Sequence, residues 1–416
     1  MLPNSTIEIQ NQILGVALDI SGTPFSLHYS SERHSGRQAA YTLNIPLTNA
    51  RISSEVQEVQ LEIQVAGQKF IEKFPPQPNL KHTFNWDGKD REGKICFGQQ
   101  PATLRTSYIY QNGKPPRSKS SIMNLGTWSG LSLGFGGWSL DVHHSYDISG
   151  DVLHLGNGKR RAKLGIKTNS LDAEIKIPNE NGEQVYVFDK YGRHVRTVNS
   201  LTRGILHQFA YDNRGFLASI TDGDNNITPI ERSPNGTPLA IVSPYGQRFP
   251  LSLNAEGYLA TIANSSAETA SFTYGNGGLL TSFSDPKGNV YRFEYDELGR
   301  LKSREEPDGN FSLLSRTPTK AGFKVARITP SGQESSYVTE RLPDGKERQI
   351  NKCCGAGGIV ALTDKRGNQT ITYPDGSTLL EEKQPDPQFG QLLPFTKRRV
   401  LPLQAVSSQG FPALGL

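Results

Sequence analysis

The stretch FEYDELGRL at residues 293–301 decides the fold, because its pattern returns several times along the chain. Two aromatic residues separated by one position, then Asp, two variable residues and Gly, are typical of a strand that enters a tight turn. Side chains alternate across a strand, so Phe293 and Tyr295 should share one face. Asp296 can hydrogen-bond within its own turn, and Gly299 can adopt a positive φ. The stretch therefore predicts a β-hairpin.

The turn glycine of this pattern returns at a nearly constant spacing. The spacings are 23, 21, 21, 21 and 21 residues, between Gly192, Gly215, Gly236, Gly257, Gly278 and Gly299. A second turn recurs in the same register at Gly204, Asn225, Gly246, Ala267, Gly288 and Gly309. Two turns leave about thirteen residues of each period, enough for two strands of ordinary length. A fixed period near 20 residues indicates a stacked array in which each unit buries its apolar face against its neighbours.

The repeat motif includes aromatic residues before the turn, the turn Asp and the turn Gly. Its members are Tyr186, Phe188, Asp189, Gly192, Phe209, Tyr211, Asp212, Gly215, Phe272, Tyr274, Gly278, Phe293, Tyr295, Asp296 and Gly299. The copies that begin at residues 230 and 251 keep the turn but lack the tyrosine.

The copies Tyr-Asp-x-x-Gly-x-Leu at residues 211–217 and 295–301 resemble the repeats of YD-repeat proteins, the family that includes bacterial Rhs and teneurin-like proteins. Residues 11–47 and 134–161 are similar to the segments that precede the repeat shell in the bacterial members. The resemblance implies hairpins wound into a hollow β-shell with the tyrosines facing inward. It also implies that the chain is the N-terminal part of the shell region of a larger secreted or cell-surface polypeptide.

The regions outside the regular repeats also predict β-structure, and the whole chain is expected to be all-β. In VQLEIQVAG, the alternating Val59, Leu61, Ile63 and Val65 predict one face of an antiparallel, Ig-like β-sandwich. The expected regions are a sandwich at 1–120, a β-rich connector at 121–180, repeats at 181–315, degenerate polar hairpins at 316–390 and a frayed tail at 391–416.

Composition excludes several classes of protein. The 45 basic and 40 acidic residues are interspersed and give a net charge of +5, so nucleic acid is not an expected partner. No window of 18 apolar residues predicts a membrane-spanning helix. The start of the chain lacks a signal-peptide pattern, so a fragment of a longer extracellular or cell-surface protein is expected.

Few residues are candidates for a metal site or a disulfide bond. Asp87, Asp90 and Glu92 could hold Ca²⁺ if a loop gathered them, but their spacing is not that of an EF-hand, and Asp-Gly is a common turn pair. His143 and His144 should lie on opposite faces of a strand, so only Asp141 and His143 could share a metal. Three cysteines do not make a disulfide framework: Cys96 is expected in a core, and the adjacent Cys353 and Cys354 as thiols.

The sequence contains no catalytic constellation, such as GxSxG, HExxH or a Walker loop, and no cofactor is expected. Two functions remain open. The first is a non-enzymatic structural module that builds a β-shell around another segment or displays it, with the remainder of the larger polypeptide as its partner; the family resemblance implies that this segment could be a toxin in the full-length protein. The alternative is a carbohydrate-binding or adhesion module for glycans or proteins of the cell surface. In that case sugars would stack on Phe209/Tyr211, Phe272/Tyr274 and Phe293/Tyr295.

Overall fold

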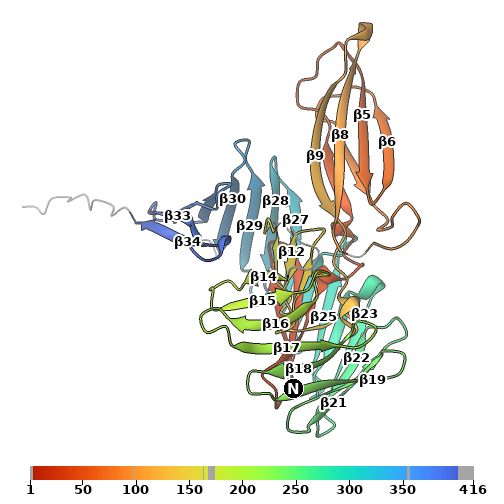
Figure 1. The fold of residues 1–416 in the computed structure, drawn as a ribbon. Helices are drawn as coiled ribbons and strands as arrows, with labels where there is room; N and C mark the ends of the chain where they lie inside the picture. Colours follow the sequence, from red (N-terminus) through yellow and green to blue (C-terminus); the bar gives the residue numbers. More distant parts are fainter. Residues whose placement is uncertain (1–2, 97, 163, 167–173, 354–356, 402–416) are drawn as a thin grey trace, which may run out of the picture. The chain divides into compact units, whose positions relative to one another are not determined.

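The computed structural model describes residues 3–96, 98–162, 164–166, 174–353 and 357–401 (Figure 1). These residues form β-strands and short 3-10 helices, with no α-helix in the described ranges, so the all-β prediction is confirmed. No helix there has the length and apolar character needed to cross a membrane. The chain divides into two compact units, one ending at Gly309 and one beginning at Asn310, and each is described by itself.

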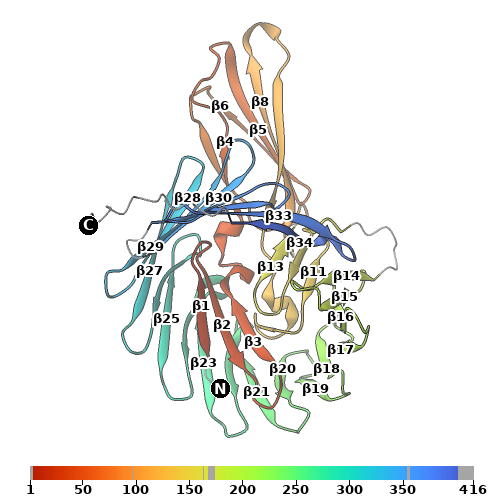
Figure 2. The ribbon, with the colours of Figure 1, turned by 90° about the vertical axis from the view of Figure 1, so that its left-hand side faces the viewer.

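The first unit begins with a small antiparallel sheet in the order β1-β2-β3-β10. Its strands are β1 (Asn4–Glu8), β2 (Ile13–Asp19), β3 (Ser26–Ser30) and β10 (Ser139–Leu140). Short 3-10 helices follow β3 and precede β10, namely η1 (Ser31–Arg33), η2 (Gln38–Ala40) and η4 (Gly130–Leu133). The apolar side chains of β2 and β3, including Leu14, Leu18 and Leu27, are fully buried. Figure 2 shows β1, β2 and β3 as neighbouring strands in the same unit as the repeats.

A β-sandwich is inserted between η2 and η4. It consists of a two-stranded sheet, β4-β7, and a four-stranded sheet, β6-β5-β8-β9. The strands are β4 (Thr42–Pro46), β5 (Val56–Val65), β6 (Gln68–Phe74), β7 (Lys81–Asn85), β8 (Gln100–Tyr110) and β9 (Arg117–Leu125), with η3 (Gln111–Gly113) between the last two. Val59, Leu61, Ile63 and Val65 are at most 1% exposed and pack with Phe84 from the other sheet, which confirms their predicted common face. Cys96 is half-buried against this core, as expected.

Two boundaries differ from the sequence prediction. Residues 4–30 do not belong to the sandwich, because they pair with β10 in a separate sheet, so the sandwich begins at β4 rather than at residue 1. It has six strands, fewer than the seven of an Ig constant domain. The sandwich also extends past residue 120 to Leu125, because β9 pairs with β8 along its whole length.

A three-stranded sheet leads from the sandwich to the repeats. It contains β11 (Ser145–Asp147), β12 (Val152–His154) and β13 (Arg160–Ala162). Tyr146 and Leu153 of this sheet pack with Ile177 and Phe188 at the start of the repeats. The connector is therefore β-rich, as predicted, and shares a core with the first hairpin.

From β14 onward, each strand of the first unit pairs antiparallel with the next in chain order. The strands are β14 (Ile175–Pro178), β15 (Gln184–Phe188), β16 (His194–Asn199), β17 (Ile205–Tyr211), β18 (Leu217–Asp222), β19 (Ile227–Arg232), β20 (Pro238–Val242), β21 (Arg248–Leu253), β22 (Leu259–Ala263), β23 (Thr269–Tyr274), β24 (Leu280–Ser284), β25 (Val290–Tyr295) and β26 (Leu301–Glu305), with η5 (Asn276–Gly278) between β23 and β24. Figure 1 shows the succession along β14 to β19. The predicted unit of two strands and two turns is confirmed.

The turn chemistry explains why the Asp and the Gly recur. In the turn after β25, the Gly299 amide donates to the Asp296 carbonyl at 2.9 Å, and the Asp296 amide donates to the Arg300 carbonyl at 2.8 Å. The Asp296 carboxylate accepts from the amides of Leu298 and Arg300. Gly299 has φ +69°, the conformation that a bulged hairpin turn requires. The turns at Asp189 and Asp212 are built in the same way.

The second turn of each repeat departs from the prediction at one position. Asn225 (φ +64°), Ala267 (φ +60°) and Gly288 (φ +84°) adopt the expected left-handed conformation. In the first copy, however, Arg203 has the positive φ (+62°) rather than Gly204. This turn is one residue longer, because the Asn199 amide bonds to the Gly204 carbonyl. The longer turn accounts for part of the irregular 23-residue spacing.

The second unit consists of longer and more polar strands, again paired in chain order. They are β27 (Phe311–Pro318), β28 (Gly322–Ile328), β29 (Glu334–Arg341), β30 (Glu347–Cys353), β31 (Ile359–Thr363), β32 (Gln369–Thr372), β33 (Thr378–Asp386) and β34 (Gly390–Val400). Residues 390–400 thus form a strand that pairs with β33, where the sequence analysis placed the start of a frayed tail. Cys353 ends β30 and is exposed, whereas Cys354 lies outside the described residues.

The structure predicts that the sandwich can be removed without unfolding the repeats. The amide of Gly126 donates to the Ala40 carbonyl at 2.8 Å, so the two ends of the insertion already meet. Replacing residues 42–125 with a short Gly-Ser linker should leave a soluble chain with a β-type circular dichroism spectrum and a cooperative thermal transition. Replacing residues 4–19 with the same linker is the control and should abolish that transition. Loss of the transition in both chains would show that the sandwich is part of the repeat core.

Candidate functional site, the seam between the repeats and the N-terminal segments

The repeat tyrosine links each hairpin to the one before it. The hydroxyl of Tyr295 donates to the Leu280 carbonyl at 2.9 Å, and that of Tyr274 donates to the Leu259 carbonyl at 2.8 Å. Each acceptor is the first residue of the second strand in the preceding hairpin, next to a bulge that shifts the register. Burial raises the pKa of Tyr295, so its hydroxyl remains a donor. The tyrosine therefore satisfies a main-chain carbonyl in the neighbouring repeat.

An arginine takes over this role in one copy that lacks the tyrosine. Arg232 occupies the tyrosine position before Gly236, and its Nε and Nη2 donate to the Leu217 carbonyl at 3.2 and 3.1 Å. Sequence analysis did not identify Arg232, although its position four residues before the turn glycine and its donor groups were visible signals. In the next copy, Leu253 stands at this position and has no hydrogen-bonding side chain.

Segments from the N-terminal part of the chain satisfy the main-chain amides beside the same bulges. The amide of Leu259 donates to the Gly136 carbonyl at 3.1 Å, and that of Leu301 donates to the Gln12 carbonyl at 2.9 Å. The amide of Leu280 donates to the Tyr29 hydroxyl at 2.9 Å. We call this contact between repeat hairpins and residues 11–40 and 126–156 the seam.

Gln12 bonds to the repeats through both its main chain and its side chain. Its Nε2 donates to the Leu301 carbonyl at 2.9 Å, so both main-chain groups of Leu301 bond to one residue 289 positions away. Gln12 is 2% exposed and has φ +52°. The buried guanidinium of Arg37 donates to the carbonyls of Gln12 and Gly299 at 2.9 and 3.1 Å. Arg37 thus joins the N-terminal turn to the turn of the best-matching repeat.

Aromatic side chains fill the seam. Trp138 is fully buried, and its indole nitrogen donates to the Tyr274 hydroxyl at 2.9 Å. Its ring lies 4.7 Å from that of Phe272, and Tyr29 stacks on His34 at 4.8 Å. Phe209, Phe272 and Phe293 are at most 4% exposed. The rings of these phenylalanines are therefore covered by the chain itself and cannot stack on sugars, whereas the tyrosines of the same pairs are half-buried.

At the first repeats the seam contains histidines instead of glutamine. His143 Nε2 and the Tyr211 hydroxyl lie 2.8 Å apart, and the His144 amide donates to His194 Nδ1 at 3.1 Å. The rings of His144 and His194 stack at 5.0 Å. Phe188 takes the tyrosine position of the first copy and stacks on His194 at 5.0 Å. These imidazoles act as buried packing and hydrogen-bonding groups.

The acidic residues suggested from the sequence as metal ligands form hydrogen bonds and ion pairs with other groups of the protein. Asp141 accepts from the Ser26 amide and hydroxyl, not from a group shared with His143. Asp90 accepts from the amides of Glu92 and Lys94, and Glu92 pairs with Lys94. The described ranges contain no group of three or more His, Cys, Asp or Glu side chains placed to bind a metal. Asp90 and Glu92 thus belong to their own turn, whereas Asp141 links its loop to β3.

The stacked two-turn hairpins have counterparts in a known protein family. The fold and the seam define a protein class built from β-hairpin repeats closed by an N-terminal segment. The family model for the Teneurin YD-shell matches residues 172–410, more than half of the chain. The chain belongs to this family, and the resemblance noted from the sequence is confirmed.

Individual relatives match over parts of the chain. Mouse Teneurin-3 is 35% identical over 197 residues, which cover 43% of this chain and 7% of that protein. Teneurin-1 of Caenorhabditis elegans is 31% identical over 163 residues, which cover 38% of this chain and 6% of that protein. The match to the solved structure of TcdB2-TccC3 covers 95% of this chain and 25% of the chain in that structure, at 11% identity and with a TM-score of 0.24. The chain thus spans less than a tenth of these teneurins.

Substituting Gly299 tests the seam directly. A Cβ at Gly299 would overlap the main-chain carbonyl of Gly36, whereas a Cβ at Gly288, which also has positive φ, meets nothing within 4 Å. Backbone strain should lower the free energy of unfolding of both alanine variants by about 1 kcal/mol. The free energy of unfolding of Gly299→Ala should fall by about 1–3 kcal/mol more, because the main-chain atoms of Gly36 cannot rotate away from the new Cβ. Chemical denaturation measures the difference, and equal free energies of unfolding would mean that the seam is misplaced.

The buried histidines predict a loss of stability in mild acid. Burial lowers the pKa of His34 to about 3 and that of His143 to about 4, and it places the pKa values of His144 and His194 well below 6.5. The histidines of the unfolded chain bind protons near pH 6.5. The stabilisation that comes from keeping these histidines neutral in the folded chain is therefore complete above that pH, and it is lost as the pH falls toward their pKa values in the folded chain. Each fully buried histidine should contribute about 1–2 kcal/mol of destabilisation between pH 7 and pH 5.

Thermal denaturation at pH 8, 7, 6 and 5 measures this effect. His34→Phe removes one titrating group and keeps a ring to stack on Tyr29, so its melting temperature should fall less between pH 7 and pH 5 than that of the original chain. Parallel pH profiles for the two proteins would contradict the assignment.

Proposed function

We propose that the chain is a non-enzymatic structural module of a larger polypeptide, in which it builds part of a β-shell that encloses or displays another segment. One observation carries the proposal. Main-chain groups beside the bulges of three hairpins, at Leu259, Leu280 and Leu301, bond to residues from the N-terminal part of the chain. The seam therefore closes one end of the hairpin array with groups from the same chain.

The polar chemistry of the seam supports a structural role. The hydroxyls of Tyr29, Tyr274 and Tyr295 donate to main-chain carbonyls or accept from main-chain amides. The buried guanidiniums of Arg33 and Arg37 donate to carbonyls and to one serine hydroxyl. Groups held in this way stabilise the backbone and have no vacant position for a reacting substrate.

The proposal includes a location outside the cell or on its surface, which is what the family resemblance implies. The partial coverage of the teneurins supports only that the chain is part of a longer polypeptide. The remainder of the longer polypeptide would be the principal partner. A carbohydrate-binding or adhesive role stays the second candidate, and it must rest on residues other than the buried phenylalanines of the repeats.

Limited proteolysis of the longer polypeptide tests the proposal. The complete reading frame would be expressed with the original sequence, with Gly299→Ala and with the matched Gly288→Ala. Mass spectrometry of the fragments should show one segment outside the repeats that resists protease in the original protein and in Gly288→Ala but is cut early in Gly299→Ala. A pattern of cleavage that is the same in all three proteins would overturn the enclosing role.

A further inference from the structure

Strand β9 forms one margin of the larger sheet of the sandwich, and β6 forms the other margin (Figure 1). It pairs with β8 along its whole length, and no strand within the described ranges pairs with its other side. Eight of its 9 residues are exposed, although a strand that packs on a core buries alternate side chains. The strand therefore offers a free row of main-chain N–H and C=O groups.

The exposure of β9 results from the unequal width of the two sheets. Ala102 and Leu104 of β8 are at most 3% exposed. Their partners across the pair, Met123 and Ser121, point to the same face of the sheet but are exposed. On that face, the two-stranded β4-β7 sheet covers β8 and stops before β9. Both faces of β9 are thus open to a neighbouring segment.

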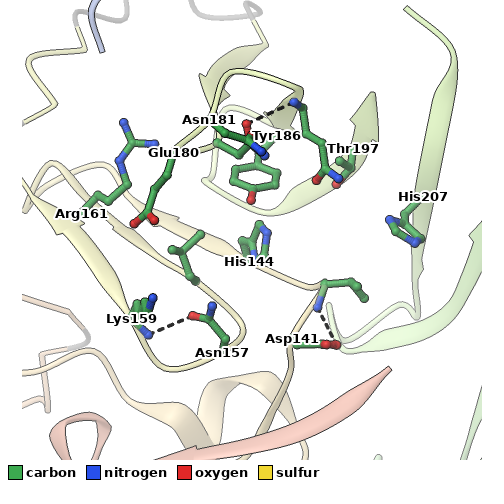
Figure 3. Close-up of a pocket in the computed structure, with 14 residues that line it drawn as sticks. Asp141, His144, Asn157, Lys159, Arg161, Glu180, Asn181, Tyr186, Thr197 and His207 are labelled. Carbon is green, nitrogen blue, oxygen red and sulfur yellow. Dashed lines mark hydrogen bonds between the residues drawn. The ribbon is translucent and has the colours of Figure 1, made fainter. Parts of the chain in front are cut away.

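The first half of β9 is cationic. Arg117 and Lys119 line a hollow of about 420 Å³ together with Arg51 from the loop after β4. None of the described residues that line this hollow is acidic, and none of these three cations forms an ion pair with a described residue. The pocket beside β12 and β15 differs, because its lining includes Asp141 and Glu180 as well as cations (Figure 3). The hollow at β9 therefore carries positive charge that its own lining does not neutralise.

The second half of β9 is uncharged and exposes two large apolar side chains. Ile122 is 72% exposed and Met123 is 44% exposed, and the two point to opposite faces. Edge strands are ordinarily protected against pairing by charges, proline or a bulge. From Ser120 to Leu125 the strand has neither charge nor proline, and its register with β8 is continuous. This half of the edge is open to pairing, whereas the charged half can select the partner.

We propose that β9 binds an extended acidic segment of another protein by strand addition. The segment would pair antiparallel with β9, with carboxylates opposite Arg117 and Lys119 and an apolar side chain opposite Met123. Side chains directly opposite each other in such a pair lie about 4.5–5.5 Å apart, so each carboxylate can reach its cation. Main-chain hydrogen bonds supply affinity, and the alternate side chains supply specificity.

A second copy of β9 fits this edge less well than an acidic strand, because it brings two further cations and no carboxylate. The proposal does not rest on the shell function, because β9 lies outside the seam, which residues 11–40 and 126–156 form with the repeats.

Peptide titrations on the full 416-residue chain test the proposal. The probe is a fluorescent peptide as long as β9, in which Val, Thr, Glu and Glu occupy alternate positions from the N-terminus and Thr fills the others. Fluorescence anisotropy should give saturable binding with a dissociation constant of about 1 mM or tighter. A peptide of the same composition with the two Glu adjacent, and therefore on opposite faces, should bind about threefold more weakly or less tightly still. A peptide with Lys in place of Glu should not bind.

Amide hydrogen exchange distinguishes strand addition from adsorption by charge alone. At saturating probe, alternate amides of β9 should exchange more slowly, because they donate to the added strand, while the amides of β6 should be unchanged.

Two double variants make the test specific to this edge. Arg117→Gln with Lys119→Gln should weaken probe binding about threefold to tenfold. Lys69→Gln with Lys73→Gln removes the same charge from β6, where these lysines pair with glutamates of β5 at 3.1 and 3.3 Å, and should change binding less than about twofold. Circular dichroism confirms that both variants are folded. The proposal is overturned if the acidic probe does not bind, if both double variants weaken its binding equally, or if the β9 amides exchange equally with and without it.

Discussion

The bulge at the end of each repeat hairpin is the constraint on which the first unit depends. It makes room for the tight Asp-x-x-Gly turn, but it interrupts the ladder and leaves main-chain groups that need partners. A buried group without a partner costs about 1–3 kcal/mol, and the bulge recurs in every repeat. The tyrosine, the substituted Arg232 and the N-terminal residues Tyr29 and Gln12 all supply these partners. The repeat residues and the N-terminal residues therefore satisfy the same kind of main-chain group, the one left without a partner at the bulge.

The period, the turns and the β-class could be predicted from the sequence, because Asp296 and Gly299 act on atoms within four residues of themselves. The seam could not be predicted. Gln12 and Leu301 are far apart in the sequence, and a lone glutamine has no local pattern that identifies its acceptor. Arg232 was missed because the motif was defined by residue type, whereas the structure requires only a donor at that position. The sandwich boundary was misplaced because β1 to β3 alternate like sandwich strands and reveal their partner, β10, only in space.

The histidines show how burial decides the role of a reactive side chain. In sequence, His143 could share a metal only with Asp141. The structure instead surrounds His143 and His144 with the rings of Phe209, Tyr186 and His194. An imidazole without a nearby carboxylate is held neutral in such surroundings. His143 pairs with the Tyr211 hydroxyl, and His144 accepts from the Gly156 amide. His144 also lines a pocket beside β12 and β15.

The separation between Gln12 and Leu301 also has a consequence for synthesis of the chain. The ribosome adds about 5–20 residues per second, so the N-terminal turn emerges roughly 15–60 s before its partner strand. During that interval the N-terminal strands cannot make their contacts with the last hairpins of the first unit, such as that of Gln12 with Leu301. The turn at Gln12 therefore completes its contacts only after the repeats up to Leu301 have been made. Expression yield should depend more on chaperone supply and elongation rate than on the equilibrium stability of the finished fold.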